Sequence, residues 1–140
     1  MEVVQILYDY ISQKEQEKST LLVQLKQYME DIKEVVQIHN ILHDNCLQSY
    51  PYNTQSLSEE CNIFWIPFEN KNSLRMVLPD EHAGTFIIDN EGNYCIVKAE
   101  RHIIKESLEI ENKYLSMFCK WFPKYRDNVF EFVKNNFKTD

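Results

Sequence analysis

The first 47 residues constrain the fold most, because they contain neither glycine nor proline and repeat apolar side chains at helical spacing. Spacing of three and four residues is typical of a helix that packs along one seam. A helix of this length would extend about 65–70 Å, so we expect part of it to project from its domain. One inner heptad position holds Val4, Ile11, Lys18, Leu25, Ile32, His39 and Cys46, and the other holds Leu7, Lys14, Leu21, Tyr28, Val35 and Leu42.

Two lysines, Lys14 and Lys18, interrupt this seam on both inner positions. They leave two arrangements open. The segment is either one continuous helix with a polar interruption, or a helical hairpin that turns near Lys18 and Ser19, with Ser19 as the second cap. The absence of glycine and proline favours the continuous helix, so we predict a coiled-coil-like helix over residues 1–47.

The remainder predicts a polar linker over residues 48–61 and a small domain over residues 62–140. Short β-branched and aromatic runs predict four strands, within residues 62–68, 74–78, 85–88 and 94–97. Asn90 and Gly92 suit a tight turn between the last two, which favours an antiparallel meander. Two helices are predicted to follow, one over residues 101–121 that ends at Pro123, and one capped by Asp127. The predicted class is therefore α+β.

Composition and charge limit the classes of function that this chain could have. The formal net charge is −7, which disfavours a nucleic-acid surface because such a surface needs a basic face. No apolar run is long enough for a membrane span, and no leader-like segment opens the sequence. We expect an intracellular protein, cytoplasmic or nuclear, or in the host cytoplasm if it is viral, because its four cysteines lack disulfide-framework spacing: Cys46, Cys61, Cys95 and Cys119.

Catalytic and metal-binding patterns are weak. His39, His43 and Cys46 share one helix face, and Cys61 would be a fourth zinc ligand, but the heptad places His39 and Cys46 on the packing seam. Core packing therefore explains them better, although metal binding stays open. With only two glycines there is no phosphate-binding loop, and we expect neither enzyme activity nor a cofactor.

The seam itself is the best candidate for a partner contact, with the same protein or with another helical protein in a homo- or heterodimer. Trp121 and Tyr125 flank a helix breaker and are candidates for an exposed aromatic contact on the domain. The seam residues expected to bind a partner are Leu7, Ile11, Leu21, Leu25, Tyr28, Ile32, Val35 and Leu42.

The element order resembles kinetochore coiled-coil subunits that carry a small RWD-type domain. The residues behind the resemblance are the sheet opening at 63–66, the turn at 70–72 and the apolar pattern at 127–133. It implies a heterodimeric structural subunit whose helix pairs with a partner helix and whose domain docks a peptide.

Taken together, the sequence favours a non-enzymatic protein–protein interaction module that dimerises through its N-terminal helix and docks a partner with its α+β domain. The alternative is a small acidic inhibitor or immunity-type protein, encoded by a virus or phage, that blocks an enzyme by stoichiometric binding. Such an inhibitor would bind a basic enzyme surface.

Overall fold

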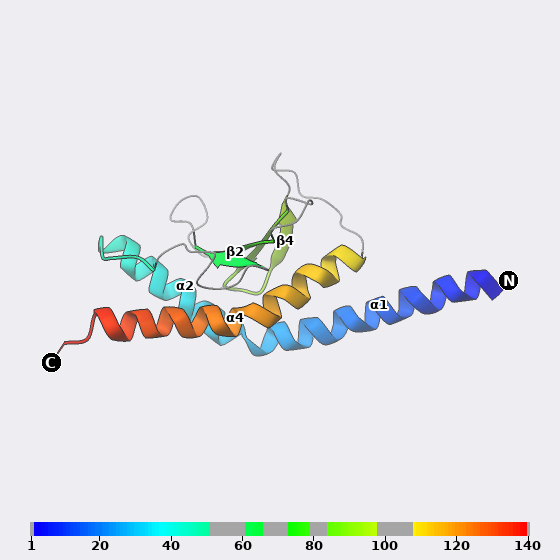
Figure 1. Ribbon diagram of the computed structural model, residues 1–140, viewed down its shortest axis with the longest axis horizontal. Helices are drawn as coiled ribbons and strands as arrows, with labels where there is room; N and C mark the ends of the chain where they lie inside the picture. Colours follow the sequence, from blue (N-terminus) through cyan, green and yellow to red (C-terminus); the bar gives the residue numbers. More distant parts are fainter. Residues whose placement is uncertain (1, 51–60, 66–72, 79–83, 98–107, 140) are drawn as a thin grey trace.

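The computed structural model describes residues 2–50, 61–65, 73–78, 84–97 and 108–139. Its helices are α1 (Glu2–Gln27), α2 (Met29–Asp44) and α4 (Leu108–Asn136), and its strands form one sheet (Figure 1). The predicted α+β class is confirmed. None of the helices in these described ranges is both long and apolar enough to cross a membrane.

The sheet is a four-stranded antiparallel meander, as predicted. Its strands are β1 (Asn62–Phe64), β2 (Ser73–Val77), β3 (Thr85–Asp89) and β4 (Tyr94–Val97), in the order β1-β2-β3-β4. The β3–β4 turn depends on Gly92, whose φ of 91° suits glycine, and on the Asp89 carboxylate, which accepts the backbone N–H of Glu91 and of Asn93. One register row, on the face that packs against the helices, contains Ile63, Met76, Phe86 and Ile96.

The predicted continuous N-terminal helix is interrupted at Tyr28, and α2 leaves the direction of α1 there (Figure 1). The Tyr28 N–H donates to the Leu25 carbonyl, a tight i to i−3 turn that needs neither glycine nor proline. The Tyr28 ring packs on Phe122 with centroids 5.7 Å apart. The alternative turn near Lys18 is wrong, because α1 runs through it.

The two predicted C-terminal helices are one helix, α4, with Pro123 inside it. Asp127 also lies inside α4 and pairs with Arg126, so it does not cap a second helix. A proline removes one helical hydrogen bond, and α4 changes direction in the middle of its length (Figure 1). The helix continues because Phe118 and Phe122 before the bend, and Val129 after it, are all fully buried on its inner face.

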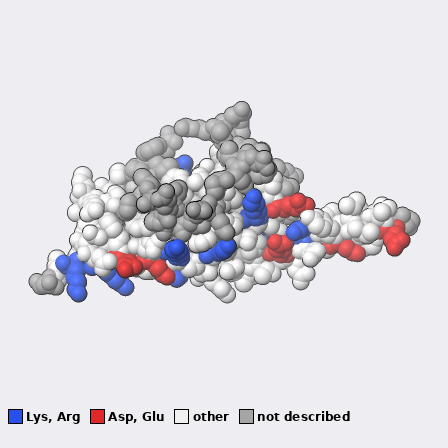
Figure 2. Space-filling model, in the orientation of Figure 1, with Lys and Arg blue, Asp and Glu red and all other residues white. Residues whose placement is uncertain are grey.

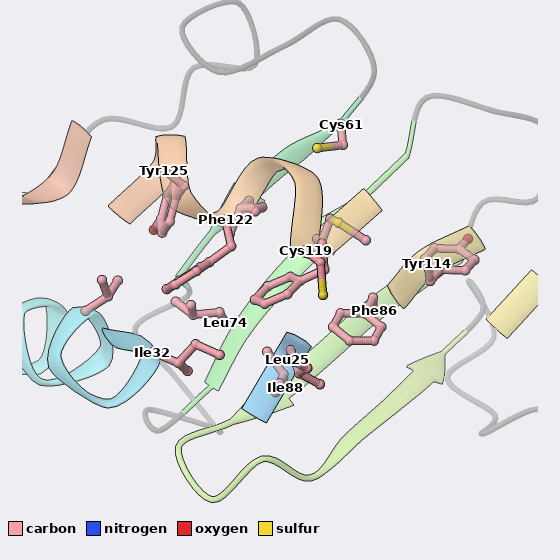
Figure 3. Close-up of a cluster of buried hydrophobic side chains, with 14 of the residues drawn as sticks. Leu25, Ile32, Cys61, Leu74, Phe86, Ile88, Tyr114, Cys119, Phe122 and Tyr125 are labelled. Carbon is pink, nitrogen blue, oxygen red and sulfur yellow. The ribbon is translucent and has the colours of Figure 1, made fainter. Parts of the chain in front are cut away.

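The core lies between one face of the sheet and the helices (Figure 3). Sheet residues Leu74, Phe86 and Ile88 meet Phe118 and Phe122 of α4, and the Phe86 and Phe118 rings are 5.3 Å apart. The second half of the N-terminal segment belongs to this same core, through Leu25, Ile32, Val35 and Val36.

Candidate partner-binding surface

The beginning of α1 carries a dense group of exposed apolar side chains. Between 41% and 70% of each side chain is exposed, although all of them lie within nine consecutive residues. Monomeric proteins rarely expose so continuous an apolar surface unless it binds something. We call these residues the α1 tip: Val3, Val4, Ile6, Leu7, Tyr8, Tyr10 and Ile11.

The α1 tip has the spacing of a helix that inserts into a groove. Val4, Leu7, Tyr8 and Ile11 are related as i, i+3, i+4 and i+7, which places them along one face. At about 100° per residue, the tip forms a broad apolar arc, and the polar side chains share the opposite face. A hydrogen bond on that polar face joins Gln5 Nε2 to Asp9 Oδ1 at 2.9 Å.

The α1 tip extends beyond the start of α4. The two helices run in the same direction, and within the described ranges Tyr10 is the first residue of α1 with a hydrogen bond to α4. Tyr10 Oη donates to Glu109 at 2.5 Å, and the Lys14 carbonyl accepts from Asn112 Nδ2 at 2.9 Å. In Figure 1 the N-terminal part of α1 projects past the sheet and past α4. The helix face that later packs on α4 is therefore uncovered at its beginning.

A polar cluster fixes α1 beside α4 and β4. Glu111 Oε1 accepts hydrogen bonds from Lys18 at 2.8 Å and from Tyr94 Oη at 2.7 Å. Burial raises the pKa of Glu111, but the hydrogen bonds from Lys18 and Tyr94 outweigh burial and the pKa is lowered. Burial raises the pKa of Tyr94 as well, so this phenol stays protonated. Lys18 interrupts the apolar seam because its partner is an acidic residue of α4.

Most of the predicted seam lies inside the protein. Leu25, Ile32, Val35 and Leu42 are at most 4% exposed, and Leu21 and Tyr28 are half-buried against the core. Leu25, Ile32 and Val35 belong to the core shared with the sheet and α4, and Leu42 is buried as well, so these four side chains contact no partner unless the protein opens. The heptad pattern predicted that these residues contact a partner, whereas the structure places them inside the protein. Of the eight seam residues expected to bind a partner, Leu7 and Ile11 are exposed.

The two aromatic residues predicted to form an exposed contact, Trp121 and Tyr125, differ in burial. Tyr125 is buried, with its hydroxyl 2.8 Å from His39 Nε2, so it is not an exposed contact. Trp121 is half-buried, and the Nζ atoms of Lys120 and Lys124 lie 5.2 Å and 5.8 Å from its ring centroid. Of these two residues, only Trp121 keeps part of its side chain exposed to solvent.

His39, His43, Cys46 and Cys61, the candidate zinc ligands, do not form a metal site in the part of the chain that the structure describes. His39 is 4% exposed and stacks on Trp65 with centroids 5.5 Å apart, and burial lowers its pKa to about 4. Cys46 occupies the left-handed position (φ 54°) that ends α2, where the Leu47 N–H donates to the Leu42 carbonyl. Among the described residues, no group of three or more His, Cys, Asp or Glu side chains could hold a metal ion.

Five residues of the α1 tip were missed as contact residues from the sequence, namely Val3, Val4, Ile6, Tyr8 and Tyr10. A heptad pattern selects only two inner positions in every seven residues, whereas this segment is apolar over a wider arc of the helix. The signal that would have found it is the high apolar density before Lys14 with no intervening lysine or arginine. The chain matches no protein-family model, no curated protein and no solved structure.

Proposed function

We propose that this chain is a non-enzymatic protein–protein interaction module that inserts the α1 tip into an apolar groove of a partner protein. The observation that carries the proposal is the exposure of seven apolar side chains on one projecting helical segment. Leu25 is the one described residue of α1 that is fully buried, although the helix has 26 residues. Helices in proteins gain most of their stability from packing, which favours a partner that covers this one.

The size of the surface suits a modest affinity. An apolar side chain contributes about 60–120 Å² of apolar area, if 1.5–3 kcal/mol is divided by 25 cal/mol per Å². With just over half of each side chain exposed, the α1 tip offers on the order of 400 Å². Burial of this area is worth about 10 kcal/mol before the costs of association, which are of similar size. Little of this free energy remains after those costs, so we expect the α1 tip alone to bind weakly, with a dissociation constant well above about 1 μM.

Charge indicates the kind of partner that the chain would meet. Glu2 and Asp9 lie on the projecting segment, and residues 2–13 contain no lysine or arginine. Figure 2 shows acidic side chains on the projecting helix, which is otherwise mostly uncharged. The net charge of −7 would speed the encounter with a partner of basic surface.

Site-specific photo-crosslinking in the cell of origin tests this proposal. A benzophenone amino acid at Leu7 should form a covalent adduct with one partner, and the same group at Gln16 should not, because Gln16 is exposed on the opposite face of α1. Ile11→Asp should abolish the adduct from position 7. The partner, identified by mass spectrometry and purified, should then bind the chain with an affinity that falls at least tenfold in Ile11→Asp.

The identity of the adduct also separates the two roles considered for the chain. A coiled-coil structural protein would support a kinetochore-like subunit, and an enzyme inactivated at one chain per active site would support the inhibitor role. Equal adducts from positions 7 and 16, or unchanged affinity in Ile11→Asp, would refute docking through the α1 tip.

A further inference from the structure

The middle of α4 is basic, although the chain as a whole is acidic. Residues 112–126 contain four lysine or arginine residues and no aspartate or glutamate, whereas the net charge of the chain is −7. Acidic residues come directly before and after this part of the helix, at Glu111 and Asp127. Figure 2 shows basic side chains over the middle of the molecule, along the course that α4 takes in Figure 1. This part of α4 therefore carries a local positive charge.

Three of the four basic residues lie on one face of the helix. At about 100° per residue, Lys113, Lys120 and Lys124 fall within an arc of about 40°. All three side chains are exposed. Arg126 lies on a different face, and its guanidinium pairs with Asp31 at 2.8 Å, so its charge is already compensated. The three lysines carry the positive charge of this surface.

Apolar side chains accompany the lysines on the same side of α4. Met117 and Trp121 are half-buried against the core and lie one helical turn apart. The Nζ atoms of Lys120 and Lys124 lie 5.2 Å and 5.8 Å from the Trp121 ring centroid, within the range of a cation–π contact. Tryptophan is among the residue types that contribute most to protein interfaces. We call these five residues, which share an arc of about 100°, the α4 stripe: Lys113, Met117, Lys120, Trp121 and Lys124.

We propose that the α4 stripe binds an acidic segment of a partner protein. The carboxylates of the segment face the lysines, and its apolar side chains contact Met117 and Trp121. One segment meets both kinds of group because they lie on the same helix face. Lys113 and Lys124 are about 16 Å apart along the helix, a length that about 5 residues of extended chain cover. This inference goes beyond the proposed function, because it concerns a second surface, away from the α1 tip.

Charge and chemistry favour a protein segment over a nucleic acid at the α4 stripe. The net charge of −7 opposes the approach of a nucleic acid, which carries a negative charge on every phosphate. This repulsion is smaller for a segment with only a few carboxylates. At physiological salt, charges farther away than about 8 Å are largely screened, so the nearby lysines determine the interaction. Partly exposed Met117 and Trp121 add apolar contacts that are typical of protein interfaces.

Fluorescence anisotropy with labelled peptides tests the proposal on the full chain. The first probe is a peptide of about 15 residues that repeats Glu-Glu-Leu, long enough as a helix to cover the stripe. In one matched peptide lysine replaces glutamate, and in another serine replaces leucine. A single-stranded DNA of the same number of nucleotides represents nucleic acid.

Two variants with equal net charge locate the binding site. The stripe variant combines Lys113→Gln, Lys120→Gln and Lys124→Gln. The control variant removes three exposed lysines outside the stripe, by Lys33→Gln, Lys134→Gln and Lys138→Gln. Exposed substitutions of this kind change stability little, so both variants should fold.

The wild type should bind the Glu-Glu-Leu peptide and not the lysine peptide, with an affinity that falls as salt rises. The stripe variant should bind it about tenfold more weakly, because each of three exposed ion pairs is worth about two- to fivefold. The control variant should bind like the wild type, and the serine peptide and the DNA should bind more weakly than the Glu-Glu-Leu peptide. Absent binding, equal losses in both variants or tighter binding of the DNA would each overturn the proposal.

Ile11→Asp separates this inference from the proposed function. It should bind the Glu-Glu-Leu peptide like the wild type, because Ile11 belongs to the α1 tip. A loss of peptide binding in Ile11→Asp would place the peptide on the α1 tip and overturn the assignment to the α4 stripe. The crosslinking at Leu7 judges the proposed function whichever result is obtained here.

Discussion

The burial of His39 makes the stability of the fold depend on pH within a defined window. Its ring is 4% exposed, stacks on Trp65 and lies 2.8 Å from the Tyr125 hydroxyl. Burial lowers the pKa of His39 from 6.5 to about 4, so the folded chain holds a neutral ring at pH 7. Below pH 6.5 the unfolded chain binds a proton that the folded chain does not, and the free energy of unfolding must fall as the pH falls.

The size of the loss follows from the two pKa values. At 1.36 kcal/mol per pKa unit, the shift from 6.5 to 4 removes about 2 kcal/mol by pH 5 and about 3 kcal/mol by pH 4. A total stability of about 5–15 kcal/mol is usual for a domain, so this one residue would remove a large part of it. Below pH 4 both states are protonated and the loss from His39 stops growing.

Urea unfolding at pH 7, 6 and 5 measures this loss. His39→Gln keeps a polar group near Tyr125 but cannot titrate, and His43→Gln, on a half-buried residue of the same helix, is the control. The carboxylates titrate alike in all three proteins, so differences between proteins isolate each histidine. The wild type should lose about 2 kcal/mol relative to His39→Gln between pH 7 and pH 5. An equal loss of unfolding free energy in the wild type and in His39→Gln would refute the argument.

Three further substitutions test the core and the surface. Gly84→Ala should cost about 1–3 kcal/mol in urea unfolding, because its new methyl group would lie 2.6 Å from the buried Tyr114 hydroxyl; an unchanged midpoint would contradict this. Leu7→Asp should change the free energy of unfolding by less than about 0.5 kcal/mol, since Leu7 is 63% exposed. Leu25→Asp should unfold the chain, as circular dichroism would show, and a folded monomer would instead support the seam as a partner contact.

The strands and their pairing could be predicted from the sequence because their signals are local. Alternation in β2, the apolar β-branched and aromatic run of β3, and the turn that contains Gly92 each act over a few neighbouring residues. The same local view failed at Tyr28 and Pro123. Tyr28 sits in a turn that no breaker residue marks, and Pro123 stays in a helix because buried aromatic residues on α4 outweigh its missing hydrogen bond.

The candidate surface could be predicted only in part, because burial of the seam depends on a distant helix. The heptads identified an apolar face correctly, but they carry no information on where α4 covers it. Lys18 was recognised as an interruption, whereas its partner Glu111 is 93 residues away in the sequence. Leu7 and Leu25 both occupy inner heptad positions, but Leu7 is exposed and Leu25 is buried. The exposures differ because α4 lies beside Leu25 and not beside Leu7.

The pairing of α1 with α4 also has a consequence for biosynthesis. The Tyr10–Glu109 and Lys14–Asn112 hydrogen bonds join residues 99 and 98 positions apart. At about 5–20 residues per second, a ribosome needs roughly 5–20 s to make the intervening segment. During that interval the apolar face of the nascent helix around Leu25 and Ile32 lacks the α4 helix that later covers it. The chain should therefore depend on a ribosome-associated chaperone until α4 has left the exit tunnel.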